Sequence, residues 1–334
     1  MSNQSEISPS NVERQSPIKL DSTSQSKRTV LNDYISSNSI GKIKRRYILT
    51  ISLISLIGFS VAIFEVLIGA VSYLDIGLFA IMSFMTGSSI TVGFHRHFAH
   101  KTFETKPIVR LLLAIFGSMA AQGSIIAWVS IHRCHHQYTD KIGDPHSPNL
   151  HGKGIKGNLQ GLWFAYIGWM FDDRLPNYLV FAKDMLRDPA IYEINRLYFL
   201  LIFLGLVIPA IIGGFLTWSW RGAFQGFIWG GVARMFYTFN AGYIINSITH
   251  AWGTRMFQSA DRSTNSIWLA IPTFGEAWHN NHHAFPGSAK FGWKWWQIDI
   301  GYWVIRGLEL LGLAWDVKLP NATSIEAKKL ASAD

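Results

Sequence analysis

Residues 47–100 decide the fold, and they read YILTISLISLIGFSVAIFEVLIGAVSYLDIGLFAIMSFMTGSSITVGFHRHFAH. Two apolar runs, residues 47–73 and 76–94, follow each other across a turn at Leu74 and Asp75. Each run has the length of a bilayer span, which needs about 20 mostly apolar residues. Because the turn is too short for any domain, the two runs are predicted to form a helical hairpin. The hairpin leads into a histidine-rich hexapeptide at residues 95–100.

Two further runs have the length of a span. Residues 197–220 carry no charge, and residues 222–249 carry Arg234 as their one internal charge. Residues 111–131 are long enough to cross once, but basic flanks on both sides predict that they lie along the interface or dip in and return. Only 15% of the residues are charged, against about a quarter in soluble domains. The sequence therefore predicts an all-α membrane protein with four transmembrane helices.

The distribution of basic residues predicts the orientation. Eight Lys or Arg occur up to Arg46 and twelve within residues 96–196, whereas the turn at Leu74 has none. Since basic residues mark the cytoplasmic side, both termini and the large middle segment are predicted to face the cytoplasm. The net charge of +9 has the same explanation, so nucleic acid is not an expected partner. Residues 1–40 are predicted to be a disordered cytoplasmic tail, and residues 321–334 a short C-terminal tail.

Nine of the twelve histidines fall into spaced clusters. On a helix, spacings of three and four place side chains on one face, so the HxxHH pattern predicts three imidazoles that point toward a common site. The HxxxxH spacing puts two histidines about 140° apart on an ideal α-helix, so this box requires a local bend or a helix end. The clustered residues are His95, His100, His132, His135, His136, His250, His279, His282 and His283.

These clusters indicate a metal site. Unpaired imidazoles are costly to bury near a membrane, while neutral imidazole is the commonest metal ligand. A zinc site uses three or four protein ligands, so nine histidines suit two metals that share a pocket. Imidazole binds Zn, Cu, Fe and Ni, so the ligand type leaves the metal open. The remaining His97, His146 and His151 are not expected to be ligands.

Four segments resemble the membrane fatty acyl desaturases of the Δ9, stearoyl-CoA desaturase-like group, with bacterial and cyanobacterial acyl-lipid members most similar. They are HRHFAH (95–100), HRCHHQYTDKIGDPHSP (132–148), NSITH (246–250) and GEAWHNNHHAFP (275–286). The similarity runs from about residue 40 to residue 320, in the family's order and spacing. It defines a predicted desaturase domain over residues 41–320.

The resemblance implies a cytosolic helical cap with two iron ions, held by the nine clustered histidines, and a water held at one iron by Asn246. It also implies an enzyme that uses O2 and two electrons to place a cis double bond, expected at Δ9, in a saturated acyl chain. Gln122 and Trp128 match positions beside the kink of an acyl tunnel. At a third substrate position the family's usual Thr-Trp is Gly242-Tyr243 here, and Tyr243 keeps a polar donor on an aromatic ring.

An external electron donor is expected, because the sequence has no His-Pro-Gly-Gly segment of a fused cytochrome b5 domain and only one cysteine, Cys134. Ferredoxin is the first candidate and cytochrome b5 the alternative. Lys153, Lys156 and Arg174 are candidate contacts for such an acidic carrier. The acyl substrate arrives on CoA, a carrier protein or a glycerolipid, and the sequence does not distinguish these.

Three other interpretations remain open. A membrane di-iron hydroxylase or monooxygenase also uses histidine-rich boxes, but it yields an alcohol instead of an alkene. A membrane zinc hydrolase needs three or four ligands and leaves about five histidines unexplained. A transporter, or a lipid-binding relative without activity, belongs to a different class. A transporter is expected to place ionisable residues near the midplane of its spans, where only Glu65 and Arg234 qualify.

Overall fold

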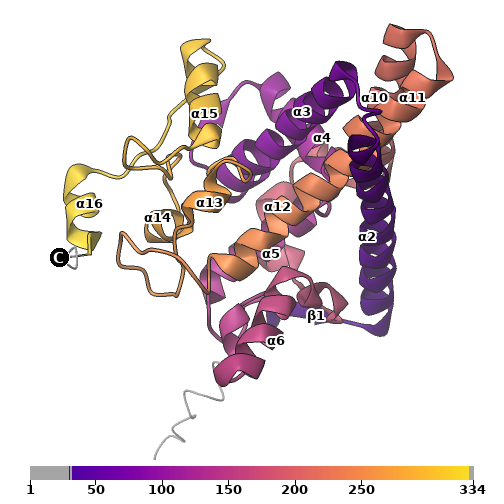
Figure 1. Ribbon diagram of the computed structural model, residues 1–334. Helices are drawn as coiled ribbons and strands as arrows, with labels where there is room; N and C mark the ends of the chain where they lie inside the picture. The colour runs from indigo at the N-terminus through magenta and orange to yellow at the C-terminus, as the bar shows by residue number, and fades with distance from the viewer. Residues whose placement is uncertain (1–29, 31, 331–334) are drawn as a thin grey trace, which may run out of the picture.

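The computed structural model describes residue 30 and residues 32–330, and it is mostly helical (Figure 1). Among these residues three helical rods are long and apolar enough to cross a membrane: α2 (Asn38–Leu67), α3 (Tyr73–Ser88) continued by the π-helix η1 (Ser89–Ala99), and α10 (Tyr198–Thr217). Large apolar side chains on α2 and α10 are exposed, as at Leu53 and Phe203. Such surfaces are unfavourable in water and suit a lipid environment.

The run predicted as the fourth span is also helical, and it lies inside the bundle from residue 227 on, whereas Trp220 and Phe224 near its start are exposed. It comprises α11 (Trp220–Gly226), the π-helix η4 (Phe227–Ala233) and α12 (Arg234–Ile248), without interruption. The π-helix contacts α2, α3 and α10. Glycines allow this approach, since a Cβ on Gly226 would lie 2.1 Å from the carbonyl oxygen of Pro209. This run is not among the three rods apolar enough to cross a membrane within the described residues.

The apolar run at 111–131 does not form one crossing helix. It divides into α4 (Pro107–Met119) and α5 (Ile125–Tyr138), joined by residues 120–124. The backbone of this connection is unusual, because Ala121 has φ +57° and Gly123 has φ +111°. Positive φ ends a helix and reverses the chain. The run therefore bends at residues 120–124 and does not continue as one helix.

Four short strands depart from the predicted all-α architecture. Strand β1 (Tyr34–Ser36) pairs antiparallel with β3 (Arg174–Pro176), and β2 (Glu104–Thr105) pairs with β4 (Ala314–Trp315). The tail predicted over residues 1–40 lies mainly outside the described residues, but its end forms β1. The predicted tail at 321–334 contains a helix, and its last four residues lie outside the described part. The remaining helices are η2 (Pro148–Leu150), α6 (Gly154–Tyr166), η3 (Gly168–Phe171), α7 (Tyr178–Phe181), α8 (Lys183–Leu186), α9 (Pro189–Arg196), α13 (Ile267–Ala270), α14 (His279–Ala284), α15 (Ile300–Leu310) and α16 (Ala322–Lys328).

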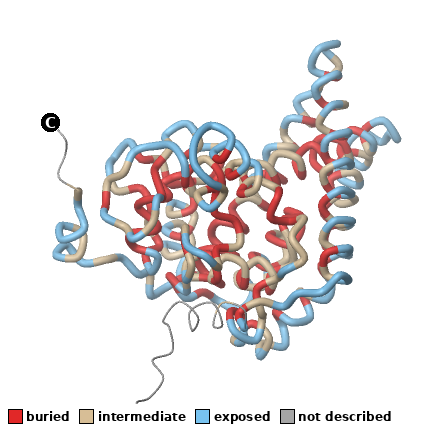
Figure 2. The backbone as a smooth tube through the Cα atoms, turned by 90° about the horizontal axis from the view of Figure 1, so that it is seen from below, coloured by how far each residue is buried: buried red, intermediate tan, exposed pale blue. Residues whose placement is uncertain are grey.

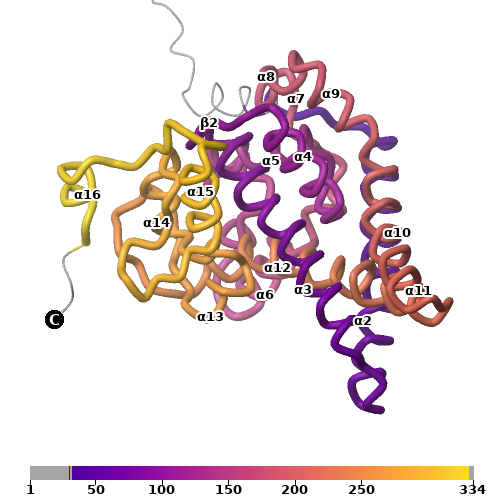
Figure 3. The backbone as a smooth tube through the Cα atoms, turned by 90° about the horizontal axis from the view of Figure 1, so that it is seen from above, coloured from indigo at the N-terminus to yellow at the C-terminus, as the bar shows by residue number. Residues whose placement is uncertain are grey.

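The buried residues gather in the centre of the molecule, as Figure 2 shows in red. In Figure 3 the C-terminal helices α13 to α16 lie on one side of α3 and α5, and α2, α10 and α11 lie on the other. The π-helix η1 is buried along its whole length, and the histidine-bearing helix α14 is buried throughout. This arrangement brings three histidine-rich segments, far apart in the sequence, into one buried region.

Candidate metal centre and adjoining cavity

The HxxxxH box lies on a π-helix. In η1 the N–H of a residue bonds to the carbonyl five residues earlier, and the N–H of His100 donates to the carbonyl of His95 at 3.1 Å. This wider turn brings residues five apart onto the same side. The rings of His95 and His100 have centroids 4.9 Å apart. The local departure from α-helical geometry that the spacing required is therefore present, as a π-helix.

Five of the nine predicted histidines form a first group. The Nε2 atoms of His100 and His132 are 2.7 Å apart, and Nε2 of His282 lies 3.0 Å from that of His95 and 2.9 Å from that of His136. One ring nitrogen from each residue lies within 4.8 Å of the others. This group draws its members from η1, α5 and α14.

The other four predicted histidines form a second group. His135 comes from α5, His279 and His283 from α14, and His250 follows the end of α12. Nε2 of His250 lies 3.0 Å from Nε2 of His279. As in the first group, one ring nitrogen per residue lies within 4.8 Å of the rest. Groups of five and four imidazoles provide enough nitrogen ligands for one metal ion each.

Each HxxHH box is divided between the two groups, contrary to the single common point that the spacing predicted. In α5, His132 and His136 belong to the first group and His135 to the second. Residues four apart lie about 40° from each other around a helix, but adjacent residues lie about 100° apart. The middle histidine of the box therefore reaches a different centre from its two neighbours.

Four carboxylates hold the outer nitrogens of the histidines, and the sequence analysis missed all of them. Nδ1 of His135 lies 2.9 Å from Asp144, Nδ1 of His250 lies 3.1 Å from Asp140, and Nδ1 of His283 lies 3.0 Å from Asp261. Glu276 contacts Nδ1 of His95 in the same way. Carboxylates in this position fix the ring orientation of metal-binding histidines. The available signal was their place near the boxes: Asp140 and Asp144 lie in the quoted segment after HRCHH, and Glu276 precedes HNNHH by three residues.

The unpaired ring nitrogens fit metal binding. Nε2 of His135 and Nε2 of His283 are buried and have no hydrogen-bond partner among the described residues, while Nδ1 of each is bonded to a carboxylate. A buried donor or acceptor without a partner is costly, and a bound metal ion removes that cost. Both ring nitrogens of His135 and of His283 would then have a partner, a carboxylate at Nδ1 and a metal ion at Nε2.

Burial favours the neutral form of six of the nine clustered imidazoles. It lowers the pKa of His100, His132, His136, His279 and His282 well below the usual value, and the neighbouring histidines add to the effect. Burial also lowers the pKa of His283 to about 4, although Asp261 opposes this. Metal ions bind the neutral form of imidazole, so these rings are in the binding form at neutral pH.

The three histidines not expected to be ligands lie in different places. Nδ1 of His97 lies 3.1 Å from the carbonyl oxygen of Phe103, and the ring of His151 packs against Phe164. Neither belongs to a group of candidate ligands within the described residues. His146 differs, because it is buried, packs against His135 with ring centroids 4.4 Å apart, and forms a third candidate group with His135 and Asp144.

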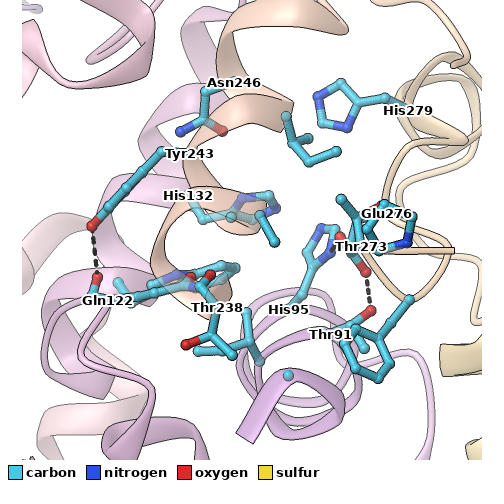
Figure 4. A pocket seen from close by; sticks show the side chains of 18 of the residues that line it. Thr91, His95, Gln122, His132, Thr238, Tyr243, Asn246, Thr273, Glu276 and His279 are labelled. Atoms are coloured by element: carbon cyan, nitrogen blue, oxygen red, sulfur yellow. Dashed lines mark hydrogen bonds and ion pairs between the residues drawn. The ribbon is translucent and has the colours of Figure 1, made fainter. Parts of the chain in front are cut away.

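A cavity of about 100 Å³ adjoins both histidine groups. It is lined by His95 and His132 from the first group, by His279 from the second, and by Asn246. Figure 4 shows these four side chains facing the same space. Asn246 lies on α12, one turn before His250. The cavity wall is mainly apolar and therefore suits an acyl chain.

Gln122, Trp128 and Tyr243, the three predicted substrate residues, all line this cavity. The ring of Trp128 stacks on His132 with centroids 5.1 Å apart. The hydroxyl of Tyr243 donates to the carbonyl oxygen of Gln122 at 3.2 Å, and the side-chain amide of Gln122 donates to the carbonyl oxygen of Thr238 at 2.6 Å. The side chains of Tyr243 and Gln122 are thus each fixed by a backbone carbonyl at the cavity wall.

The unusual Gly242 accommodates Gln122. A Cβ on Gly242 would lie 2.6 Å from Nε2 and 2.7 Å from Oε1 of Gln122. No real Cβ approaches an atom this closely, so any larger residue at position 242 must displace the amide. The replacement of the family's usual threonine by Gly242 is therefore coupled to the position of Gln122.

Comparison with known proteins supports the same family. Residues 72–314 match the profile of the family described as fatty acid desaturase. The chain is 49% identical over 309 residues to a hex-5-enoyl-[acyl-carrier protein] acetylenase of Moorena producens (strain JHB), covering 92% of this chain and 95% of the relative. It is 35% identical over 264 residues to an sn-1 stearoyl-lipid 9-desaturase of Anabaena variabilis (78% and 90%). It is 39% identical over 236 residues to delta-9 acyl-lipid desaturase 1 of Arabidopsis thaliana (70% and 72%). The resemblance read from the histidine boxes is confirmed, and the chain belongs to the fatty acid desaturase family.

Proposed function

We propose that this oxidoreductase introduces a cis double bond at the Δ9 position of a saturated acyl chain. The nine histidines of the two groups would hold two iron ions, and Asn246 would hold a water at one of them. The observation that carries the proposal is the contact between the two histidine groups and a cavity lined by Gln122, Trp128 and Tyr243. A saturated chain in this cavity would lie beside both groups.

The reaction removes two hydrogens from a CH2–CH2 pair and reduces O2 to two waters, with two electrons and two protons supplied from outside. Bound iron would supply the oxidising power that an unactivated C–H bond requires. The residues of the chain hold and shield the substrate. The indole of Trp128, stacked on His132, forms an apolar wall next to the first histidine group. Asp140, Asp144, Asp261 and Glu276 keep the imidazoles in their binding orientation.

The proposed membrane arrangement has four spans and a cytosolic cap. The rods α2, α3 with η1, and α10 would each cross, and the run from α11 to α12 would be the fourth, enclosed by them. The exposed apolar side chains of α2 and α10 support lipid contact for these two helices. Both termini and the histidine groups would face the cytoplasm, as the basic residues predict.

The electron donor would approach from a second side of the metal centre. An open groove is lined by His100, His136 and His283, none of which lines the acyl cavity, and by the exposed Lys141. This favours an acidic carrier, ferredoxin or alternatively cytochrome b5. Of the contacts expected from the sequence, Arg174 is already paired with Asp172.

In an assay with reduced ferredoxin, Lys141→Glu should weaken the apparent affinity on the order of tenfold. A larger effect from Lys153→Glu would indicate that the electron donor binds beside α6 and not at this groove.

A second candidate activity is the conversion of an enoyl chain to an alkyne. The relative that is 49% identical over nearly its whole length is named as an acetylenase acting on a hex-5-enoyl chain of an acyl-carrier protein. This reaction removes two hydrogens from the terminal CH=CH2 to give C≡CH, and it again reduces O2 to two waters with two electrons and two protons from outside. The substrate for this chain would then be a short acyl group on a carrier protein, instead of a long chain on a glycerolipid or CoA.

Product analysis tests both candidates. The chain is expressed with a suitable ferredoxin and its reductase in a host that lacks the corresponding unsaturated acid, and total acyl groups are analysed by gas chromatography–mass spectrometry. Carrier-bound hexanoyl and hex-5-enoyl groups are supplied in parallel to isolated membranes. A new long monounsaturated acid supports desaturation, and derivatisation gives its position. An alkyne from hex-5-enoyl carrier protein alone supports the second activity. A hydroxy acid as the product would favour a hydroxylase. Zinc instead of iron in the purified protein would favour a hydrolase.

A further inference from the structure

Three consecutive residues at the edge of the acyl cavity are each bonded by a tyrosine hydroxyl. Tyr47 donates to the carbonyl oxygen of Ala121 at 2.7 Å, and Tyr243 donates to that of Gln122 at 3.2 Å. The N–H of Gly123 donates to the hydroxyl of Tyr198 at 2.9 Å. The tyrosines come from three helices, α2, α12 and α10. The segment 121–123 is thus held from three directions.

Two of the tyrosines form a continuous hydrogen-bond chain. The hydroxyl oxygens of Tyr47 and Tyr198 are 2.5 Å apart. Because a hydroxyl has one proton, and that of Tyr47 goes to Ala121, Tyr198 must be the donor to Tyr47. The order is then the N–H of Gly123, the hydroxyl of Tyr198, the hydroxyl of Tyr47 and the carbonyl of Ala121. Loss of either hydroxyl breaks two links of this chain.

The segment needs such support, because its backbone is unfavourable. Ala121 has φ +57°, which residues with a side chain rarely adopt. Gly123 also has a positive φ, at +111°. The bonds on either side are also made by distant side chains: Arg234 donates to the carbonyl of Met119 at 2.7 Å, and Asn195 accepts from the N–H of Ile126 at 3.1 Å. A conformation of this kind persists where the surroundings determine it fully.

We propose that Tyr47 and Tyr198 are positioning residues that determine which methylene pair is oxidised. Gln122 lies between the two bonded residues, and its amide, fixed to Thr238, lines the cavity that adjoins the histidine groups. Neither Tyr47 nor Tyr198 lines the cavity among the described residues. Their effect on an acyl chain therefore passes through the depth at which Gln122 enters the cavity. This inference rests on the proposed function.

The variants Tyr198→Phe and Tyr47→Phe test the proposal in the full-length protein. The control is Tyr166→Phe, which removes a hydroxyl bonded to Asn240, away from the segment. The first measurement is hydrogen exchange by mass spectrometry of a peptide containing Gly123. Tyr198→Phe should speed exchange there roughly tenfold, the effect of losing a hydrogen bond of ordinary strength. Tyr47→Phe should speed it less, because Gly123 keeps its acceptor, and Tyr166→Phe should leave it unchanged.

The second measurement is the position of the double bond in the product. The wild-type protein and Tyr166→Phe should give one isomer, whereas Tyr198→Phe should give a second isomer as at least roughly a tenth of the product. Unchanged exchange at Gly123 overturns the proposal, and so does faster exchange with a single isomer. If Tyr198→Phe is not produced in folded form, Tyr47→Phe carries the same test. A wild-type protein without any alkene product contradicts the proposed function, whereas the exchange measurement still tests the bonding of the segment.

Discussion

The carboxylate of Asp144 lies 2.9 Å from Nδ1 of His135, on the side of the ring opposite to the buried Nε2, which has no hydrogen-bond partner among the described residues. Burial alone would raise the pKa of Asp144, but its contact with His135 lowers it to about 2. The carboxylate is therefore ionised at neutral pH, and it holds the proton of the ring at Nδ1. This leaves Nε2 as the ring nitrogen available to bind a metal ion, in one group with His250, His279 and His283.

The substitution Asp144→Asn should weaken metal binding at the second group. The amide keeps the size of the carboxylate but loses its charge, and loss of such a partner lowers metal affinity about 10–100-fold. We expect a lower iron content in the purified protein, measured by inductively coupled plasma mass spectrometry. Asp173→Asn is the control, because Asp173 pairs with Arg45 at the surface. Equal iron in both variants would contradict the role of Asp144.

The two histidine groups predict two equivalent losses. His282→Ala removes a member of the first group and His135→Ala a member of the second. Each should abolish desaturation and lower the iron content, while the protein remains in the membrane fraction. His151→Ala should change little, because this ring packs against Phe164 and belongs to neither group. An active His135→Ala protein with full iron would refute the assignment of this residue as a ligand.

Gly242→Ala should alter the acyl cavity directly. The added methyl would lie within 2.8 Å of three atoms of the Gln122 amide, which is held at Thr238 and cannot retreat without losing that bond. Overpacking of this kind costs about 1–3 kcal/mol. We expect the rate of product formation to fall roughly tenfold, measured at equal iron content. Gly307→Ala, in helix α15 with no atom within 4 Å of the new Cβ, should leave the rate unchanged.

The apolar rods and the clustering of the histidines, which the structure reproduces, depend on local sequence. The apolar runs predicted α2, α3 and α10 because span length is a property of composition. The histidines were found because the boxes are short and chemically unusual. The bend required between His95 and His100 followed from helix geometry alone, although its form as a π-helix did not.

The rest depends on tertiary contacts that no local pattern contains. Asp261 reaches His283 across 22 residues, and an aspartate at that distance has no periodic relation to the box. The division of each HxxHH box between two groups depends on partners from elsewhere in the chain, such as His250, which follows the end of α12. The pairing of β1 with β3 joins the predicted N-terminal tail to the large middle segment, between residues about 140 apart in the sequence.

Arg234, the one internal charge of the predicted fourth span, is fully buried. Its Nη2 donates to the carbonyl of Gly205 at 2.8 Å, and its Nη1 donates to that of Met119 at 2.7 Å. The carbonyl of Gly205 lacks its helical donor because the residue four positions later in α10 is Pro209, which has no backbone N–H. The carbonyl of Met119 lacks a helical donor because α4 ends at this residue and the N–H of Gly123 donates to Tyr198 instead.

Arg234 therefore replaces two donors that the helices cannot supply, in a region where water is not available to do so. Arg234→Met keeps most of the volume and removes both donors, and it should destabilise the detergent-solubilised protein by about 2–5 kcal/mol, the cost of two unsatisfied carbonyls. Thermal unfolding measures this loss. In the Arg234→Met background, Pro209→Ala restores an N–H opposite Gly205 and should recover part of the stability, whereas the same change in the wild type should not stabilise. If the two substitutions are additive, Arg234 does not compensate for Pro209, because only a shared carbonyl couples the two sites.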